Sequence, residues 1–287
     1  MSYQGTCENL EKEYLRLTSA PHPSVVRPER VLKLALGSLM QKWQEDSLGV
    51  GYVYMCSQLK AIRQDLTVQH IKNDFTVEVY EVHARTALES GDMNEYNQCQ
   101  TQLKHLYTEN LKGSEEEFLA YRILYYIYLQ GNKKYQGGSG DLLDIMKHIT
   151  STQYQHEAVR HALDVRKCIQ QENYYRFFQL IQTTPNLGNF ILEPMLNNWR
   201  FMFLQRLIKA CRAGVRLSVD FIVKSMGFLS VQEGLLFLKK ANCVLISSEK
   251  KDAGETSEEE SGFDIDCKAS NELDQTLGSD PQSALLL

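Results

Sequence analysis

The sequence contains little proline, and a long central span has none. The six prolines lie at positions 21, 23, 28, 185, 194 and 281, so residues 29–184 contain none. Proline breaks helix interiors, because it lacks an amide proton and clashes with the preceding turn. This long proline-free span therefore favours a series of uninterrupted helices.

Long apolar segments are also missing. The most apolar stretch, residues 118–129, is interrupted by Arg122 and falls short of the roughly 18 residues that a membrane helix needs. The first residues are polar and acidic, without the basic start and apolar centre of a signal peptide. We therefore expect an intracellular protein with no membrane contact.

The seven cysteines form no recognisable pattern. Their number is odd, and no Cys-x-x-Cys pair occurs. A disulfide framework or a zinc site is therefore not expected. Most of the cysteines occupy apolar positions in predicted helices, where cysteine is typical of a small buried side chain.

Motifs of catalytic centres are absent from the sequence. There is no Gly-x-Ser-x-Gly elbow, and the GGSG at 137–140 lacks the Lys-Ser/Thr of a phosphate loop, which predicts a flexible loop there. His156 and His161 are five residues apart, so they point to different faces of a helix. His83 and the other helical histidines have no suitably spaced cysteine or aspartate partner. We expect no enzyme, no metal and no cofactor.

Helical periodicity is abundant. Apolar residues spaced for one helix face occur over 75–86 and again over 96–107, with Gly91-Asp92 between them. Similar turn-like pairs follow at Gly131-Asn132 and Glu172-Asn173. A recurrence of about 40 residues predicts helix pairs of the tetratricopeptide-like or HEAT-like kind, stacked as a solenoid.

The pattern changes after Pro194. A helix is expected over about 196–211, then two short helices and an apolar run at 244–246. Residues 263–267 alternate apolar and charged side chains, the pattern of a half-buried strand. Two short helices followed by a hairpin predict a winged helix. The predicted division of the chain is an N-terminal helix and linker (1–27), a helical-repeat domain (28–195), a linker helix and winged helix (196–268) with an acidic wing (249–262), and a disordered tail (269–287).

Charge is distributed unevenly along the chain. Residues 249–287 hold 11 acidic and 3 basic side chains, a net charge of −8, so the overall −5 leaves +3 for residues 1–248. A basic cluster near the winged helix predicts phosphate neutralisation and sequence-independent nucleic-acid binding, and the alternative is a solvated helix face. A further hypothesis is that the acidic wing covers this surface and competes with nucleic acid. The candidate contacts are Arg200, Arg206, Lys209, Arg212, Arg216, Lys224, Lys239 and Lys240.

The segment RQDLTVQ at 63–69 is the most distinctive in the chain. A helix is expected to end near it, and Asn73 or Asp74 can cap the next helix. We predict that the segment fixes a joint between helices by hydrogen bonds, and the alternative is a direct ligand contact. Its candidate motif residues are Arg63, Asp65, Leu66 and Thr67.

Three segments, at 5–33, 59–111 and 117–128, resemble the GANP domain of mRNA-export and mRNA-processing scaffolds, most closely the branch of leukocyte receptor cluster member 8. The resemblance extends over residues 5–246 and weakens after Lys133. It implies a PCI architecture, in which tetratricopeptide-like helices end in a winged helix, and a non-catalytic platform.

The same resemblance implies partners and location. It implies a second PCI-domain protein bound through the winged helix, a small acidic DSS-type protein bound along the helical repeats, and RNA or DNA bound by basic winged-helix surfaces. It implies a nuclear protein, with the cytoplasm as a further compartment. The alternative is a PCI subunit of a proteasome-lid or translation-initiation assembly, whose winged helix contacts protein only.

Overall fold

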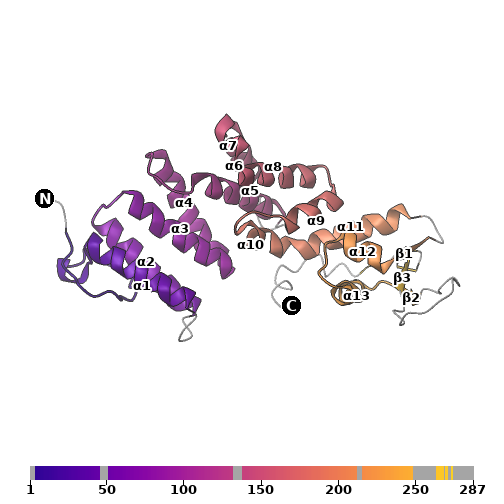
Figure 1. Ribbon diagram of the computed structural model, residues 1–287, viewed down its shortest axis with the longest axis horizontal. Coiled ribbons are helices and arrows are strands. Elements are labelled where there is room, and N and C mark those ends of the chain that lie inside the picture. The colour runs from indigo at the N-terminus through magenta and orange to yellow at the C-terminus, as the bar shows by residue number, and fades with distance from the viewer. Residues whose placement is uncertain are drawn as a thin grey trace. The chain divides into compact units, whose positions relative to one another are not determined.

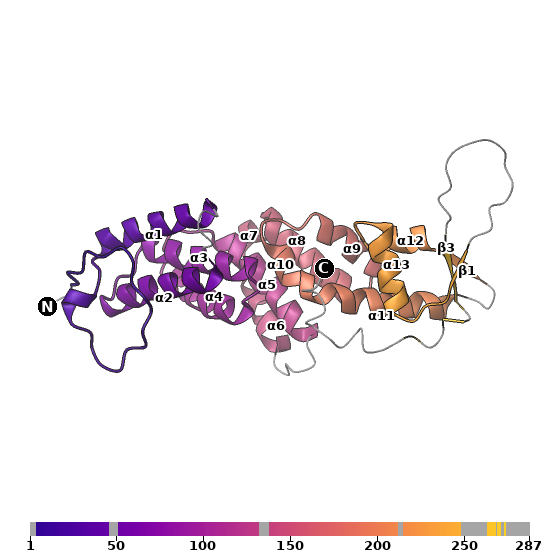
Figure 2. The ribbon, with the colours of Figure 1, turned by 90° about the horizontal axis from the view of Figure 1, so that it is seen from below.

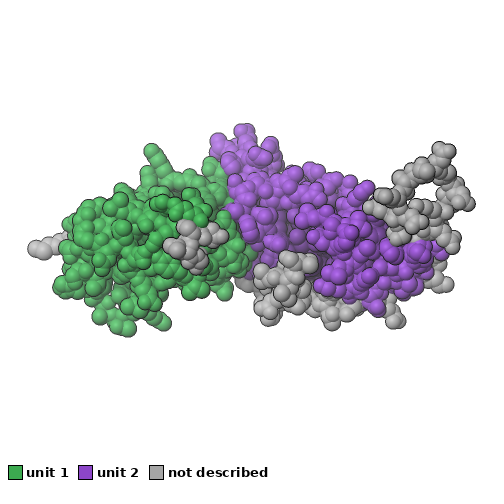
Figure 3. Space-filling view, turned by 60° about the horizontal axis from the view of Figure 1, so that its bottom comes forward, with its two compact units in different colours: residues 1–122 green, residues 123–287 purple. Residues whose placement is uncertain are grey.

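The computed structural model shows a mainly α-helical protein (Figure 1). Its contacts define two compact units, residues 1–122 and residues 123–287, coloured separately in Figure 3. The described residues are 4–45, 51–131, 138–211, 215–247, 263–267, 269–270 and 273. The predicted acidic wing and nearly all of the predicted tail lie outside them.

Unit 1 is a row of helices in which each packs against the next along the chain (Figure 2). Its helices are α1 (Glu29–Gln44), α2 (Tyr52–Val68), α3 (Asp74–Glu89), α4 (Met93–Thr108) and the first part of α5 (Glu115–Gly131). Leucine and isoleucine side chains of α1 and α2, among them Leu36, Leu59 and Ile62, form a buried core with Phe75 and Val79 of α3. The apolar stripes of these helices therefore face one another, as helical periodicity requires.

The predicted helix pair around Gly91 is confirmed. Asn73 begins α3 with a capping box, in which its side chain accepts a hydrogen bond from the Thr76 amide. The helix ends at Glu89, and Gly91 follows its C-cap with a φ of 72°, the left-handed conformation that glycine adopts without strain. Asp92 then caps α4 by accepting a hydrogen bond from the Glu95 amide.

The predicted N-terminal helix is wrong for the described residues, because residues 4–22 contain no helix. They form an extended segment, here called the N-terminal strap, which leads into a short 3-10 turn, η1 (Pro23–Val25). Side chains of α2 accept hydrogen bonds from the strap's amides: Gln58 from Lys12 (3.1 Å) and Ser57 from Tyr14 (3.2 Å). These contacts satisfy main-chain groups that a helix would otherwise bond internally.

Unit 2 continues the helical architecture. Its helices up to residue 210 are the rest of α5, α6 (Gly138–His148), α7 (Ser151–Gln155), α8 (Glu157–Gln170), α9 (Tyr174–Gln182), α10 (Gly188–Leu192), η2 (Glu193–Met195) and α11 (Leu196–Ala210). The predicted turn at Glu172-Asn173 is confirmed between α8 and α9. The predicted loop at 137–140 is wrong from Gly138 onward, because α6 begins there and buries Leu142 one turn later.

A domain boundary was predicted after residue 195, but the two compact units meet after residue 122. Aromatic rings join α9 to α11 across the predicted boundary. Phe177 lies 5.0 Å from Trp199 between ring centres, and Tyr174 lies 5.6 Å from Phe203. This packing includes the predicted linker helix, α11, in the same unit as the repeat helices before it.

The last part of unit 2 combines two short helices with a small sheet. Its elements are β1 (Arg216–Ser218), α12 (Val219–Ser225), α13 (Val231–Lys240), β2 (Leu245–Ser247) and β3 (Phe263–Asp266). The strands are antiparallel in the order β1-β3-β2, so the predicted hairpin of β2 and β3 is confirmed. The short strand β1 was not predicted. The order of the elements agrees with the predicted winged helix, which stays a prediction.

The packing of α12 on α13 depends on Gly234. A Cβ atom at this position would lie 2.3 Å from Cγ2 of Val223, well inside van der Waals contact. The two helices therefore approach closely only because residue 234 has no side chain. Among all described residues, no helix has the length and apolar character needed to cross a bilayer.

Candidate nucleic-acid and partner interface

Arg200, on α11, is committed to contacts inside unit 2. Its Nε and Nη2 atoms donate hydrogen bonds to the carbonyl oxygens of Met226 and Gly227, both at 3.2 Å. Its guanidinium also lies 3.9 Å from the ring centre of Phe228. Burial lowers the pKa of Arg200 to about 10, against the opposing charge of Glu233. Arg200 is therefore a structural link to the end of α12, and we remove it from the candidate nucleic-acid contacts.

Two further predicted cations face acidic side chains. Arg206, on α11, forms an ion pair with Glu172. Arg216, on β1, lies directly opposite Asp266 of β3, and directly opposite residues project from the same face of a sheet. Their charges are thus partly compensated within the protein. Arg212 lies outside the described residues.

Four lysines remain as exposed cations. None of them makes an ion pair among the described residues. Each lies in the last turn of its helix, where a cation stabilises the helix dipole by about 0.3–1 kcal/mol. Stabilisation of the helices is thus a reason for lysine at these positions that does not involve nucleic acid. The ammonium groups themselves remain in solvent. We call this set the lysine surface, and it consists of Lys209, Lys224, Lys239 and Lys240.

Exposed apolar side chains accompany the lysines on α13. Leu229, just before the helix, is 94% exposed, and Val231 and Leu236 are also exposed. An apolar residue just before the N-cap, as Leu229 is, often packs on the fourth residue of the helix as a hydrophobic staple. In α13 the fourth residue is Gly234, which has no side chain for Leu229 to contact. We call Leu229, Val231 and Leu236 the α13 apolar set. Large exposed apolar side chains of this kind are typical of protein contacts.

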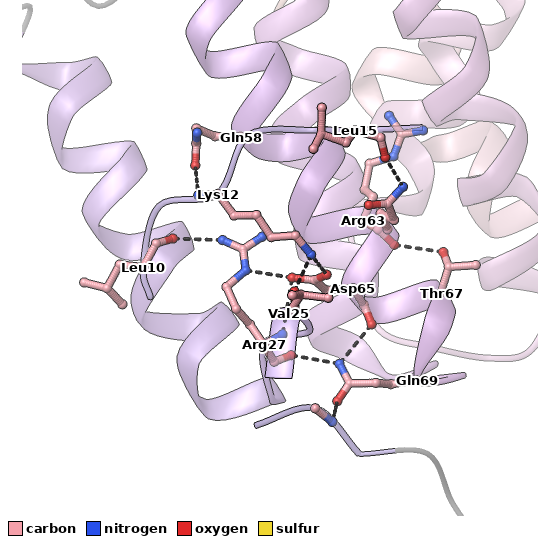
Figure 4. Close-up of polar contacts among 12 residues, drawn as sticks. Leu10, Lys12, Leu15, Val25, Arg27, Gln58, Arg63, Asp65, Thr67 and Gln69 are labelled. Atoms are coloured by element: carbon pink, nitrogen blue, oxygen red, sulfur yellow. Dashed lines mark hydrogen bonds and ion pairs between the residues drawn. The ribbon is translucent and has the colours of Figure 1, made fainter. Parts of the chain in front are cut away.

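The RQDLTVQ segment lies at the end of α2 rather than beyond it, because α2 continues to Val68. Figure 4 shows Asp65 between Arg27 and Lys12. Arg27 Nε donates to Oδ2 (2.7 Å) and Lys12 Nζ to Oδ1 (2.6 Å). Arg27 also donates to the carbonyl of Leu10 (2.8 Å). The predicted hydrogen bonds are present, and those of Asp65 join α2 to the strap and to Arg27, which precedes α1.

Arg63 lies two residues before Asp65, about half a turn, and therefore points to the other side of α2. Its Nη1 donates to His83 Nδ1 on α3 (3.0 Å), and it also contacts Glu95 and Cys99 on α4. Lys60 pairs with the same glutamate at 2.8 Å. Arg63 therefore holds three helices together.

The remaining motif residues support the same helix. Leu66 is buried in the core between α1 and α2, and the Thr67 hydroxyl donates to the carbonyl of Arg63 (2.8 Å). The contacts of the motif are thus internal, which favours the predicted structural role over a direct ligand contact.

One group of possible metal ligands occurs among the described residues, and sequence spacing missed it. Cys56, His83 and Glu95 lie on three helices, with their ligating atoms within 4.8 Å of one another. The Arg63 guanidinium contacts His83 and Glu95, and Lys60 also neutralises Glu95. A metal cation at this place would face two existing cations. The group does not fit a metal site, and its charges are satisfied by protein.

Comparison with known proteins decides the family. A model described as the SAC3/GANP family matches residues 7–246. The chain belongs to the SAC3/GANP family.

Several relatives of this SAC3/GANP chain are similar over most of its length. It is 42% identical to a THP3 homolog of Schizosaccharomyces pombe over 85% of this chain and 59% of the relative. It is 41% identical to a leukocyte receptor cluster member 8 homolog of Xenopus laevis over 93% of this chain and 30% of the relative. It is 33% identical to Protein THP3 of Saccharomyces cerevisiae over 83% and 49%. The chain thus spans about three fifths or less of these relatives.

In this SAC3/GANP chain, the stability of unit 1 is expected to fall as the pH drops below about 6.5. Burial, together with the charges of Arg63 and Lys60, lowers the pKa of His83 to about 2, so the folded state keeps it neutral. The unfolded chain protonates the same histidine near pH 6.5. The unfolded state therefore binds more protons, and this one group removes about 2 kcal/mol between pH 7.5 and 5.0.

Urea unfolding at both pH values measures this effect. The comparison is with His83→Gln, which keeps a polar side chain without a titrating ring. The difference in unfolding free energy between the two pH values should be smaller for the variant by about 2 kcal/mol. Equal differences in the two proteins would show that His83 titrates alike in both states.

Proposed function

We propose that this protein is a non-catalytic scaffold subunit that acts in transcription-coupled mRNA processing and nuclear export, with the nucleus as its main compartment. The observation that carries the proposal is the SAC3/GANP family match over residues 7–246. The helical architecture suits a scaffold, because stacked helix pairs present long surfaces to partners. The relatives named THP3 and leukocyte receptor cluster member 8 homolog support the same assignment.

The proposed nucleic-acid contact is the lysine surface. Lysine binds phosphate as a point charge without reading bases, so it contributes affinity that depends on salt rather than on sequence. The protein is therefore proposed to bind the RNA or DNA backbone, with its full affinity reached on pairing with a partner.

The proposed protein contact is the α13 apolar set, with a second PCI-domain protein as its occupant. Family membership supports this partner, and the exposure of Leu229 and Leu236 supports the place. A small acidic DSS-type protein is proposed to bind along the helical repeats.

The variant Leu229→Ser/Leu236→Ser is expected to lose the PCI-domain partner while keeping its fold. Leu229 is 94% exposed and Leu236 is 45% exposed, so their replacement costs less folding free energy than that of a buried leucine. Anchors that become buried at an interface commonly contribute about 2 kcal/mol or more each. Titration of the purified partner by calorimetry should show affinity weakened by at least about 30-fold. The matched control is Val53→Ser on α2, which is 83% exposed in unit 1. Undiminished binding by the double variant would place the partner elsewhere.

Affinity purification from nuclear extract, with and without nuclease, tests the function itself. A PCI-domain partner of RNA-processing complexes, retained after nuclease treatment, is the expected result. Recovery of proteasome-lid or translation-initiation subunits in its place would favour the alternative, in which this part of unit 2 contacts protein only. Recovery of neither group would contradict a scaffold role.

A further inference from the structure

Three cysteines that are far apart in the sequence converge in unit 2. Cys211 directly follows α11, Cys243 lies between α13 and β2, and Cys267 directly follows β3. Cys267 is buried, with 2% of its surface exposed, while the other two are partly exposed. Their spacing in the sequence does not show that they converge, because each cysteine lies beside a different helix or strand.

The register of the sheet places Cys243 beside Cys267. Strands β2 and β3 pair Leu245 with Ile265, and the same antiparallel register continued by two residues sets Cys243 opposite Cys267. The Asp266 amide still donates to the Val244 carbonyl at 3.0 Å, so the pairing extends to this end of the sheet.

The regular ladder ends at this hydrogen bond. The Val244 amide donates to Ser270 Oγ (2.9 Å), and the Asp266 carbonyl accepts from the Ser270 amide (3.0 Å). Cys243 directly precedes Val244 and Cys267 directly follows Asp266, so the two cysteines lie next to the last bond between the strands. Residues directly opposite on neighbouring strands have Cβ atoms about 4.5–5.5 Å apart, and a small backbone movement brings such a pair within the range that a disulfide spans.

Cys211 approaches Cys267 from the helical side. The Cys211 thiol lies beside that of Cys267 and contributes to raising its pKa, which places the end of α11 close to the end of β3. Cys267 thus has one thiol beside it on the strand side and another on the helix side. The remaining cysteines of the described chain do not take part in this cluster: Cys7, Cys56 and Cys99 belong to unit 1, and Cys168 lies on α8.

We propose that Cys211, Cys243 and Cys267 form a thiol–disulfide exchange site, which hydrogen peroxide oxidises to a disulfide centred on Cys267. The Cys211 thiolate attacks peroxide, forms a sulfenic acid and releases hydroxide. The Cys267 thiolate then attacks the Cys211 sulfur, so that an S–S bond forms and a second hydroxide leaves. Two thiols and one peroxide thereby give one disulfide and two waters. Cys243 can attack Cys267 in the product, which moves the disulfide to the cross-strand pair and returns Cys211 to a thiol.

Protonation controls how fast this site reacts. Burial raises the pKa of Cys267 to about 11 and that of Cys243 to about 12, so both are thiols at neutral pH. Only the thiolate is nucleophilic, and its fraction rises about tenfold per pH unit below the pKa. The exchange site is therefore slow to oxidise at pH 7, and disulfide formation is expected to accelerate by up to about tenfold between pH 7.4 and 8.4.

The test uses the full chain, treated with hydrogen peroxide at pH 7.4 and 8.4, alkylated and digested for mass spectrometry. The expected products are peptides joined between Cys267 and either Cys211 or Cys243, formed faster at pH 8.4 and removed by dithiothreitol. Cys267→Ser should abolish both, whereas Cys56→Ser in unit 1 should leave both unchanged. Cys267→Ala serves as a second variant, and circular dichroism checks that each variant is folded.

Two results would overturn the proposal. One is irreversible oxidation of Cys211 to sulfinic or sulfonic acid with no joined peptide in the wild-type protein. The other is a disulfide that forms equally well in folded Cys267→Ser and Cys267→Ala, because Cys267 would then not be the centre of the exchange.

Discussion

Replacement of Asp65 by alanine is expected to lower the free energy of unfolding of unit 1 by about 3–5 kcal/mol. Asp65 is 1% exposed, and its partner Arg27 is fully buried. Loss of the carboxylate leaves the Arg27 guanidinium as an uncompensated charge inside the protein, which is costly because water cannot replace the lost partner. Lys12, which is partly exposed, can turn to solvent. Urea denaturation followed by circular dichroism measures the change.

Two variants separate this loss from the loss of packing. Arg27→Met/Asp65→Leu removes both charges and fills the space with apolar side chains, so it should recover most of the stability. Lys72→Ala breaks an exposed ion pair with Glu109 in the same unit and should change the free energy by less than about 1 kcal/mol. If Asp65→Ala cost no more than Lys72→Ala, the buried pair would not be what fixes the strap.

Replacement of the four lysines of the lysine surface by glutamine is expected to weaken RNA binding strongly. If each lysine neutralises one phosphate, the loss of four contacts on a single strand lowers the affinity by about 10²–10³-fold at 0.1 M salt. Glutamine keeps the length of the side chain but not its charge. The loss of helix-dipole stabilisation adds about 0.3–1 kcal/mol of folding free energy per lysine, so stability must be measured alongside. Fluorescence anisotropy with a labelled single-stranded RNA measures the affinity of the protein with its PCI-domain partner.

The matched control removes the same total charge from unit 1. The four lysines of this control are exposed, and their replacement also removes the surface ion pairs of Lys33 and Lys72, so its stability is measured as well. Its affinity should fall only slightly, because none of these lysines belongs to the lysine surface. The positions are Lys33, Lys72, Lys104 and Lys112.

Periodicity in the sequence was sufficient to predict several of the regular elements. The stripes on either side of Gly91 predicted α3 and α4, because glycine at this point ends one helix and Asp92 begins the next. The alternation of Phe263, Ile265 and Cys267 predicted β3 although an acidic run precedes it. Both signals are local, and local patterns of burial are visible in a sequence.

Contacts between distant residues could not be predicted in the same way. The strap has apolar residues at helical spacing, including Leu10, Tyr14 and Leu17, yet side chains of α2 hold its main chain extended. Arg27 and Asp65 are 38 residues apart, and neither sequence neighbourhood identifies the other as a partner. Tertiary hydrogen bonds here override local helix propensity.

The candidate site illustrates the same limit. Composition showed eight cations in residues 199–240, but it could not show that Arg200 donates to the carbonyls that follow α12 or that Arg216 lies opposite Asp266 in a sheet. Nor could it show that Leu229 projects into solvent, since the deciding feature is the absence of a side chain at Gly234. Charge counting finds a region, and packing determines which charges remain accessible.

The salt dependence of RNA binding tests the central claim most directly. The dissociation constant of the complex with its PCI-domain partner is measured from 50 to 300 mM salt for the wild type, the four-lysine variant and the unit 1 control. The account predicts that the slope of log affinity against log salt is shallower by about 3 in the four-lysine variant, from about 0.7 per lost phosphate contact, and unchanged in the control. Parallel lines for the wild type and the four-lysine variant would show that these lysines do not contact the nucleic-acid backbone.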